Sequence, residues 1–319
     1  MGRHDEEPSA IDAREVALRF GLGEPVDLVG PVARGELGQV WRLTTEQGAW
    51  AVKESFGQAD PAGALADAGY SDAVRTAGVR IPTVCRTRDG DVLVAAGPRQ
   101  IRVYGWVDLD PPDRGVDPVA VGELVAAIHR VHHPHSGAVD GWYTDPVGAA
   151  SWDDLIRRLR TGRAGAADRL AALRDELVAL EHVLERPARL PTCHRDLFAD
   201  NVRTTPSGSL CVIDWENCGP QDPCQELAVV LFEFGCGAGD RVRTLYRAYR
   251  AAGGPATVGR RGDFSMLIAQ LGHIGELACR AWLEAPDPTQ RDHHAARVSE
   301  FLDDPLTRDV IDRMLDAVT

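Results

Sequence analysis

The chain has 319 residues, of which 44% are hydrophobic, and it carries a net charge of −13 at pH 7. This composition can bury a large core and predicts about two domains or lobes. The acidic balance argues against nucleic acid or an anionic membrane surface as a partner, because both are negatively charged. It suits a small cationic substrate, although acidity is also an ordinary feature of soluble proteins.

The sequence shows no sign of a membrane span or of a secretion signal. No apolar run is long enough to cross a bilayer, and Met1 to Pro8 lack an apolar core. The seven cysteines include no Cys-x-x-Cys pair, which favours reduced thiols over disulfides or a zinc site. We therefore expect a cytoplasmic protein.

In chain order, short apolar runs first predict a small antiparallel sheet that is interrupted by one helix. The expected strands lie near 26–33, 38–45, 48–54, 82–87, 91–96 and 99–105. After Pro111 and Pro112, apolar residues at three- and four-residue spacings predict a helical region. The expected helices lie near 118–132, 152–161, 166–185, 224–235, 240–252, 262–284, 290–302 and 305–318, and a short strand pair around 202–214 interrupts them.

A glycine-rich stretch lies between the first two expected strands. Residues 33–40 follow the kinase pattern G-x-G-x-x-G-x-V, with Ala33 in place of the first glycine. Gly35 and Gly38 permit close approach of the backbone to phosphates, and Val40 would pack on adenine. By itself a Gly-x-x-Gly turn is more often only a hairpin. Lys53, thirteen residues after Val40, favours the nucleotide-binding interpretation.

Lys53 is the single lysine among 35 basic residues, and it ends the strand-like run Ala-Trp-Ala-Val-Lys. A chain that otherwise uses arginine indicates a need for a compact ammonium group at this position. We expect Lys53 to hold the α- and β-phosphates of ATP.

Residues 194–201 read His-Arg-Asp-Leu-Phe-Ala-Asp-Asn, which is a phosphoryl-transfer signature. Asp196, five residues before Asn201, can act as the base at a hydroxyl while the Asn201 amide oxygen meets Mg²⁺. Thirteen residues after Asn201, an apolar run delivers Asp214 at a strand end as a second metal ligand. Asn201 is one of only two asparagines in the chain, which supports a specific need for it. His194 and Arg195 are expected to support the loop rather than to react.

Together with Gly219 to Pro223 and Glu226-Leu227-Ala228, these motifs resemble the aminoglycoside phosphotransferase and choline-kinase-like family over residues 33 to about 228. The resemblance implies an α+β, bilobal, protein-kinase-like fold with a small antiparallel-sheet N-lobe and a mostly helical C-lobe. It also implies ATP, Mg²⁺ and phosphorylation of a small-molecule hydroxyl. Glu226 stands where this family usually has Asp, and by analogy it braces the catalytic loop.

The same resemblance divides the chain into a nucleotide-covering lobe at 1–103, a hinge at 104–110 and a catalytic and substrate lobe at 111–319. In the hinge, backbone groups of Trp106 and Val107 would pair with the adenine edge. The ion-pair partner of Lys53 should come from the helix that follows it, where Asp67 fits best. The alternative is that Asp67 is only a surface charge of that helix.

Other phosphoryl-transfer and hydrolytic enzymes fit less well. A protein kinase needs some 20 to 30 residues between its metal-binding Asp and an Ala-Pro-Glu motif, whereas Glu226 follows Asp214 after only twelve residues and no such motif occurs. The P-loop motif and the hydrolase motif Gly-x-Ser-x-Gly are also absent.

The acceptor is the least determined part of the prediction. In the family, helices from about residue 262 onward line the substrate cleft, and Glu276, Trp282 and Asp287 are the weak candidates there, with surface charge and core packing as the alternative. We expect an ATP-dependent phosphotransferase that acts on an aminoglycoside or a related antibiotic, with a role in resistance. A metabolic kinase for choline, homoserine, thiamine or a sugar is the alternative, and a non-catalytic ATP-binding module is a minor one.

Overall fold

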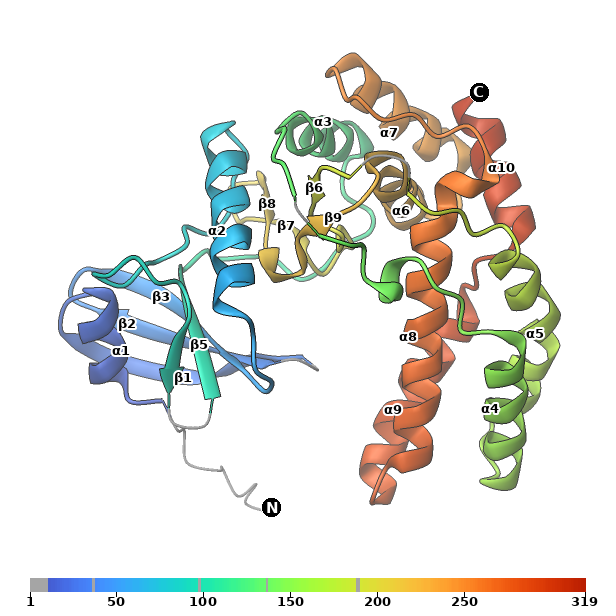
Figure 1. The fold of residues 1–319 in the computed structure, drawn as a ribbon, viewed down its shortest axis with the longest axis horizontal. Helices are drawn as coiled ribbons and strands as arrows, with labels where there is room; N and C mark the ends of the chain where they lie inside the picture. The colour runs from blue at the N-terminus through green and yellow to red at the C-terminus, as the bar shows by residue number, and fades with distance from the viewer. Residues whose placement is uncertain (1–10, 36–37, 97–98, 136, 188–189) are drawn as a thin grey trace. The chain divides into compact units, whose positions relative to one another are not determined.

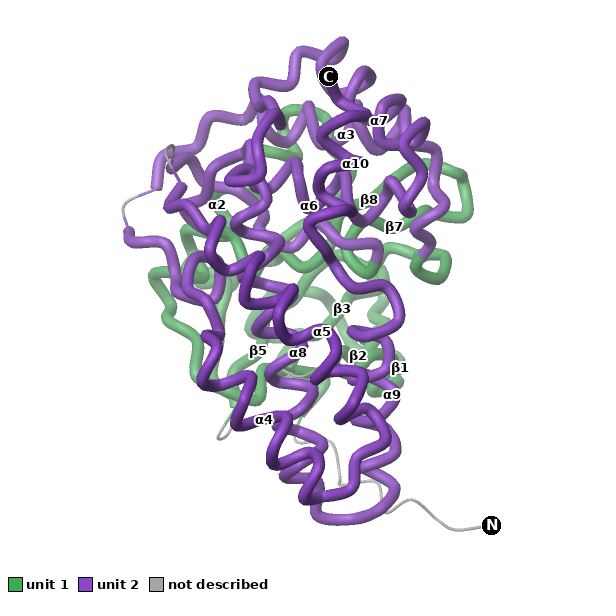
Figure 2. The backbone as a smooth tube through the Cα atoms, turned by 90° about the vertical axis from the view of Figure 1, so that its right-hand side faces the viewer, with its two compact units in different colours: residues 1–112, 200–218 green, residues 113–199, 219–319 purple. Residues whose placement is uncertain are grey.

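The structure, a computed structural model, describes residues 11–35, 38–96, 99–135, 137–187 and 190–319 (Figure 1). Its chain forms two compact units, which Figure 2 shows in different colours. The first unit comprises residues 1–112 and 200–218, and the second comprises 113–199 and 219–319. This division differs from the predicted single boundary at the hinge, because the segment 200–218 groups with the N-terminal residues.

Backbone hydrogen bonds explain why this later segment belongs to the first unit. The N–H of Val212 donates to the carbonyl of Arg80 at 3.1 Å, and the N–H of Asp110 donates to the carbonyl of Thr204 at 2.8 Å. The segment contains β7 (Val202–Thr204), β8 (Leu210–Val212) and the 3₁₀ helix η2 (Trp215–Asn217). The predicted strand pair around 202–214 is therefore present, although its strands are short.

The first unit is built on a five-stranded antiparallel sheet with the order β1-β2-β3-β5-β4. Its strands are β1 (Pro25–Arg34), β2 (Gly38–Thr45), β3 (Gly48–Ser55), β4 (Val94–Ala96) and β5 (Arg99–Gly105). The predicted antiparallel sheet is confirmed, including the helix that interrupts it, α2 (Pro61–Thr76).

One face of this sheet carries the core of the unit. Leu43, Val52 and Val103 are fully buried in one hydrophobic cluster with Val16 and Phe20 of α1 (Ala13–Phe20). Because side chains alternate between the two faces of a strand, the neighbours of these residues in sequence lie on the opposite face. That opposite face therefore receives Lys53, which follows Val52.

Two details of the first unit differ from the sequence prediction. The stretch 82–87 is not a strand, since Val84 forms only an isolated bridge with Tyr104; Pro82 has no N–H to donate to a ladder. Of the predicted strand 91–96, only the last three residues pair. Helix α1 was not predicted, although Asp12 caps its start and Gly21 ends it with a φ of 66°, both recognised helix-boundary signals.

The second unit is mostly helical. Its long helices are α3 (Pro118–His129), α4 (Ala149–Thr161), α5 (Ala167–Glu181), α6 (Pro223–Gly235), α7 (Gly239–Ala251), α8 (Ser265–Glu284), α9 (Pro288–Asp303) and α10 (Arg308–Val318). Shorter elements are η1 (Gly141–Tyr143), η3 (Arg261–Phe264) and the strand pair β6 (Thr192–Cys193) with β9 (Gly219–Pro220).

Helix α6 lies inside this helical unit, and the loop that contains Arg195 and Ala199 is hydrogen-bonded to it. It begins after the N-cap Asp222, whose carboxylate accepts from the N–H of Cys224 at 3.0 Å. Most of its residues are buried, including Glu226 and Leu227. A helix that is buried on nearly all sides can hold charged groups only where they find partners.

We predict that Gly38 is required by the packing of β2 on β3, whereas Gly35 is not. A Cβ at Gly38 would lie 2.4 Å from the carbonyl oxygen of Glu54, while a Cβ at Gly35 would meet no described atom within 4 Å. Gly38→Ala should therefore lower the free energy of unfolding by about 1–3 kcal/mol, and Gly35→Ala should change it by less than about 0.5 kcal/mol. Urea titration measures both, and equal effects would contradict the prediction.

Candidate active site

In the first unit, the predicted site residues lie around Lys53, on the face of the sheet opposite the core. Its ammonium nitrogen lies 2.7 Å from Oδ1 of Asp214 and 2.9 Å from Oε2 of Glu216. Burial alone would lower the pKa of Lys53, but the charges and hydrogen bonds of Glu216 and Asp214 outweigh it and raise that pKa. Lys53 is therefore a fixed positive charge held between two carboxylates.

The β7–β8 hairpin brings Asn201 and Asp214 together. Val202 pairs with Val212 across the hairpin, and the N–H of Ile213 donates to the carbonyl of Asn201 at 2.9 Å. Asn201 and Asp214 consequently lie at the same end of the hairpin. Asp214 has a left-handed backbone with a φ of 60°, which Asp tolerates better than most residues.

These two residues have the right chemistry for a divalent metal. A carboxylate and an amide oxygen are hard donors of the kind that Mg²⁺ accepts, with phosphates and waters completing its coordination. Within the described part of the chain, no group of three or more His, Cys, Asp or Glu side chains could hold a metal ion. The predicted pair Asn201 and Asp214 would leave coordination positions for phosphate oxygens and waters.

Glu216 is a member of the site that the sequence analysis did not identify. Its Oε1 accepts from the hydroxyl of Tyr104 at 2.8 Å, which leaves Oε2 toward Lys53. Burial and the charge of Glu216 raise the pKa of Tyr104 well above its ordinary value, so that Tyr104 remains a donor. The tripeptide Asp-Trp-Glu was the available signal, since Glu216 follows Asp214, the predicted metal ligand, by two residues.

The predicted ion pair between Lys53 and Asp67 is wrong. Asp67 lies on α2 and pairs instead with Arg102, whose Nη1 is 3.3 Å from its Oδ2. Arg102 is the cross-strand neighbour of Lys53 on β5, and its longer side chain reaches the helix. The role of the helix carboxylate toward Lys53 is taken by Glu216.

The residues that flank the glycine-rich turn, and those of the hinge, form backbone contacts with neighbouring strands. The N–H of Gly35 donates to the carbonyl of Gly38 at 2.9 Å, and Val40 is the cross-strand neighbour of Lys53. Glu36 and Leu37 of the motif lie outside the described residues. In the hinge, the N–H of Trp106 donates to the carbonyl of Ala49 at 3.0 Å. Any pairing with adenine therefore falls to the carbonyl of Trp106 and to Val107.

The helical unit contains the other predicted site residues, in the loop that carries Asp196. Glu226 of α6 accepts a hydrogen bond from the N–H of Arg195, immediately before the half-buried Asp196. Burial by itself would raise the pKa of Glu226, but the hydrogen bond and charge of His129, the charge of His194 and the Arg195 N–H lower it. The carboxylate at position 226 thus braces the loop, and Glu serves here where the family usually has Asp.

A chain of buried hydrogen bonds orients Glu226. Nε2 of His129 lies 2.7 Å from its Oε2, and both side chains are fully buried. On the other side of the ring, Nδ1 of His129 lies 2.9 Å from the hydroxyl of Tyr249, which accepts from the N–H of Ala256 at 3.0 Å. The two ring nitrogens of His129 thus link the Tyr249 hydroxyl to the Glu226 carboxylate. The polar contacts of His129 became visible only in the fold.

The side chain of Arg195 packs on Tyr143. The residue has a φ of 67°, and its guanidinium lies 4.3 Å from the ring centre of Tyr143. Its carbonyl accepts from Nε2 of Gln270 at 2.9 Å. A Cβ at Gly219 would lie 2.4 Å from the guanidinium carbon, so Gly219 is needed for this approach. These contacts agree with a scaffolding function.

The three weak acceptor candidates have structural contacts of their own. Glu276 lies 2.7 Å from Nη2 of Arg280, and Trp282 packs against the cluster of α4, α5, α8 and α9. Asp287 caps α9 by accepting from the N–H of Gln290 at 2.9 Å. The structure does not bring these three side chains together, and their contacts favour the packing and surface interpretation.

The fold belongs to the protein-kinase-like class, as solved structures of several kinases show. A spectinomycin phosphotransferase in complex with ADP and spectinomycin is 13% identical, covers 92% of each chain and has a TM-score of 0.61. An amicoumacin kinase in complex with AMP-PNP and Ca²⁺ is 14% identical over 94% of this chain and 96% of the other, with a TM-score of 0.60. A microcompartment-associated aminopropanol kinase is 16% identical over 90% and 95%, with a TM-score of 0.57.

The sequence profile of the phosphotransferase enzyme family matches residues 29–262, well over half of the chain. The protein therefore belongs to this family and is a phosphotransferase that acts on a small hydroxyl-bearing molecule. No curated protein matches the chain. Over the ranges that the structure describes, none of the helices combines the length and apolarity needed to cross a membrane.

We predict that Glu226→Gln destabilises the protein and removes part of its acid sensitivity. Losing the charge weakens the bonds from His129 and Arg195, at a cost of about 1.5–3 kcal/mol. Because the folded pKa of Glu226 is lowered, its stabilisation is present above the unfolded pKa and is lost as the pH falls through the folded pKa. Urea titrations across the acid range measure this component.

The control is Asp240→Asn, which removes an exposed carboxylate that pairs with Arg243 on α7. This variant should have the same free energy of unfolding as the wild type, and the same loss of that free energy as the pH falls. If Glu226→Gln loses stability at low pH as the wild type does, Glu226 is not an ionised group that stabilises the fold.

Proposed function

We propose that this phosphotransferase transfers the γ-phosphoryl group of ATP, with Mg²⁺, to a hydroxyl of an aminoglycoside or a related antibiotic. The observation that carries the nucleotide part is the meeting of Lys53, Asn201 and Asp214 within one compact unit. Lys53 is 161 residues from Asp214, yet the two side chains are 2.7 Å apart. Residues so distant in sequence and so suited to phosphate and metal support an ATP site.

The residues divide the work of an in-line transfer. Lys53 would bind the α- and β-phosphates, and Asn201 and Asp214 would hold Mg²⁺, which neutralises phosphate charge when bound. Asp196 would orient the acceptor hydroxyl and take its proton as the new O–P bond forms and ADP leaves. Gly35, Gly38 and Val40 would cover the nucleotide.

Support for the acceptor class is of two kinds. Two of the similar structures are named for their action on spectinomycin and amicoumacin, and a net charge of −13 suits a cationic acceptor. The metabolic alternative is supported by the aminopropanol kinase. Since Lys53, Asp196, Asn201 and Asp214 are all intact, a non-catalytic module is disfavoured. A cytoplasmic location fits the use of ATP.

The class of acceptor is tested by an ATP-consumption screen of the purified protein with aminoglycosides, other antibiotics and metabolite alcohols. We expect consumption with an antibiotic, and transfer of resistance to a sensitive host that expresses the protein. Consumption with metabolite alcohols alone would identify the metabolic alternative. Nucleotide binding without consumption for any acceptor would identify the non-catalytic module.

Asp196→Asn should abolish turnover while nucleotide affinity remains nearly unchanged, because the amide cannot accept the hydroxyl proton. General-base removal typically costs about 10²–10⁴-fold in rate. The matched control is Asp200→Asn, in the same loop, where the carboxylate is exposed. Steady-state kinetics and nucleotide titration measure the two effects, and turnover retained by Asp196→Asn would refute its assignment.

Lys53→Met and Glu216→Gln should both weaken ATP binding, the first more than the second. Lys53 loses its charge-assisted bonds to phosphate, whereas Glu216→Gln leaves the lysine with Asp214 alone. We expect the KM for ATP to rise roughly tenfold or more for Lys53→Met and by a smaller factor for Glu216→Gln. If only the acceptor KM changes, Lys53 does not bind the nucleotide.

A further inference from the structure

Helix α6 carries a second carboxylate directed at the catalytic loop. Glu233 follows Glu226 by seven residues, which is two helical turns and places both side chains on the same face. Glu226 accepts from the N–H of Arg195, and Oε1 of Glu233 accepts from the N–H of Ala199 at 3.1 Å. Asp196 lies between these two amides, so a single helix holds the loop on both sides of the expected base.

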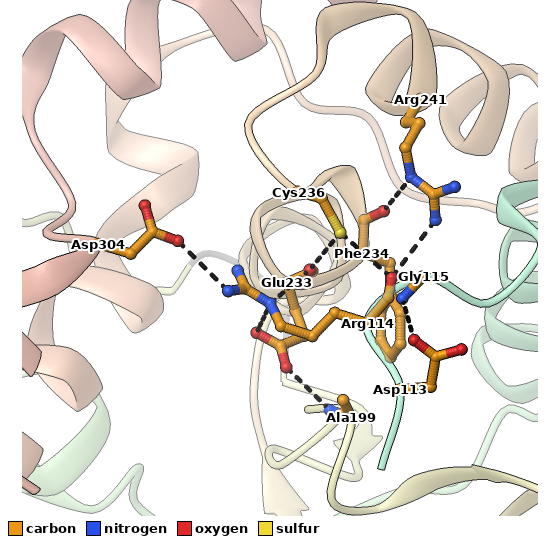
Figure 3. A network of polar contacts seen from close by, with 9 residues as sticks. All are labelled: Asp113, Arg114, Gly115, Ala199, Glu233, Phe234, Cys236, Arg241 and Asp304. Carbon is orange, nitrogen blue, oxygen red and sulfur yellow. Dashed lines mark hydrogen bonds and ion pairs between the residues drawn. The ribbon is translucent and has the colours of Figure 1, made fainter. Parts of the chain in front are cut away.

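A network of contacts around Arg114 orients Glu233 (Figure 3). Nε of Arg114 lies 3.2 Å from Oε2 of Glu233, and the same group donates to the Glu233 carbonyl at 3.1 Å. In Figure 3 the Glu233 carboxylate stands between the guanidinium of Arg114 and the backbone of Ala199. One carboxylate oxygen is thus taken by the arginine, and the other is directed at the loop.

Arg114 is itself fixed by groups outside the loop. Its Nη1 lies 3.3 Å from Oδ2 of Asp304, and its guanidinium lies 5.9 Å from the ring centre of Phe232. Its carbonyl accepts from Nη2 of Arg241 at 3.3 Å and from the thiol of Cys236 at 3.2 Å. The position of Glu233 therefore depends on Arg114, near the start of the second unit.

The hydrogen bond between the Ala199 N–H and the Glu233 carboxylate is stronger than burial of the amide requires. Ala199 is 4% exposed and the Glu233 side chain 12% exposed, and any acceptor would satisfy a buried N–H. A carboxylate gives a charge-assisted bond that holds the amide more tightly. A small displacement of a reacting group can reduce the rate far more than it reduces stability.

We propose that Glu233 is a positioning residue of the phosphoryl transfer, which acts by holding the Ala199 amide and so the distal side of the loop that presents Asp196. The inference rests on the proposed function for its kinetic consequence. It predicts a selective effect on turnover, because Glu233 contacts neither nucleotide nor acceptor in this assignment.

The test compares three variants in the full-length protein. Glu233→Met keeps the size of the side chain but removes the acceptor, and it should lower kcat roughly 10- to 100-fold while the Kd for ATP stays within about twofold of the wild type. Glu233→Gln keeps a neutral oxygen for the Ala199 N–H without the charge-assisted bond, and it should recover part of the lost kcat. Asp304→Asn removes only the exposed end of the network, where the side chain is 67% exposed, and should leave kcat unchanged.

A second measurement does not require activity. Hydrogen exchange at the Ala199 amide should accelerate in Glu233→Met and remain near wild type in Glu233→Gln, with the rest of the helical unit unchanged. This readout separates the two proposals, because a wild type that consumes no ATP refutes the proposed function and leaves the exchange result to decide on Glu233.

The inference is overturned by any of three outcomes. Glu233→Met turns over within twofold of the wild type, Glu233→Gln is as slow as Glu233→Met, or exchange accelerates evenly through the whole unit as general destabilisation requires.

Discussion

The buried negative charge of Glu226 is the constraint on which the helical unit depends. A carboxylate without exposure cannot remain ionised unless donors replace the water that it has lost. The donors come from two other parts of the chain, His129 at the end of α3 and the N–H of Arg195 in the loop. Satisfying one charge therefore fixes the loop, α3 and α6 relative to each other, and through His129 it reaches Tyr249 on α7.

In the first unit, charged groups on the polar face of the sheet also need partners of opposite charge. Lys53 and Arg102 are cross-strand neighbours, so two positive charges lie side by side. Each has its own carboxylates, Asp214 with Glu216 for the lysine and Asp67 for the arginine. This division keeps the lysine beside Asp214, the predicted metal ligand. The opposite face is free to form the apolar core with α1, because side chains alternate along each strand.

The sequence predicted those parts of the site that depend on residue type and short spacing. Lys53 was conspicuous as the only lysine, and the intervals from Asp196 to Asn201 and Asp214 identified the loop and the metal pair. The residues that were missed act across long separations. Glu216 and Tyr104 are in contact although they are 112 residues apart in sequence, and no local sequence pattern predicts such a contact.

The errors have physical causes of the same kind. Asp67 was assigned to Lys53 because it lies in the right helix, but the sequence does not reveal that Arg102 competes for the same carboxylate. The stretch 82–87 was expected to be a strand, but it forms one isolated bridge at Val84, with backbone hydrogen bonds to β5 at the flanking Thr83 and Cys85. The acceptor candidates Glu276 and Asp287 stay predictions, and in the structure they form an ion pair with Arg280 and cap α9, respectively.

By itself, the sequence determined the reaction class and the residues that would carry it, because phosphoryl transfer requires particular functional groups at short, characteristic intervals. The tertiary structure decided which charges pair and what holds the loop in place. Glu216 at Lys53 and Glu233 at the Ala199 amide are examples. Such choices depend on distances between segments that are remote in the chain, where several carboxylates of equal chemistry compete and only the fold selects one.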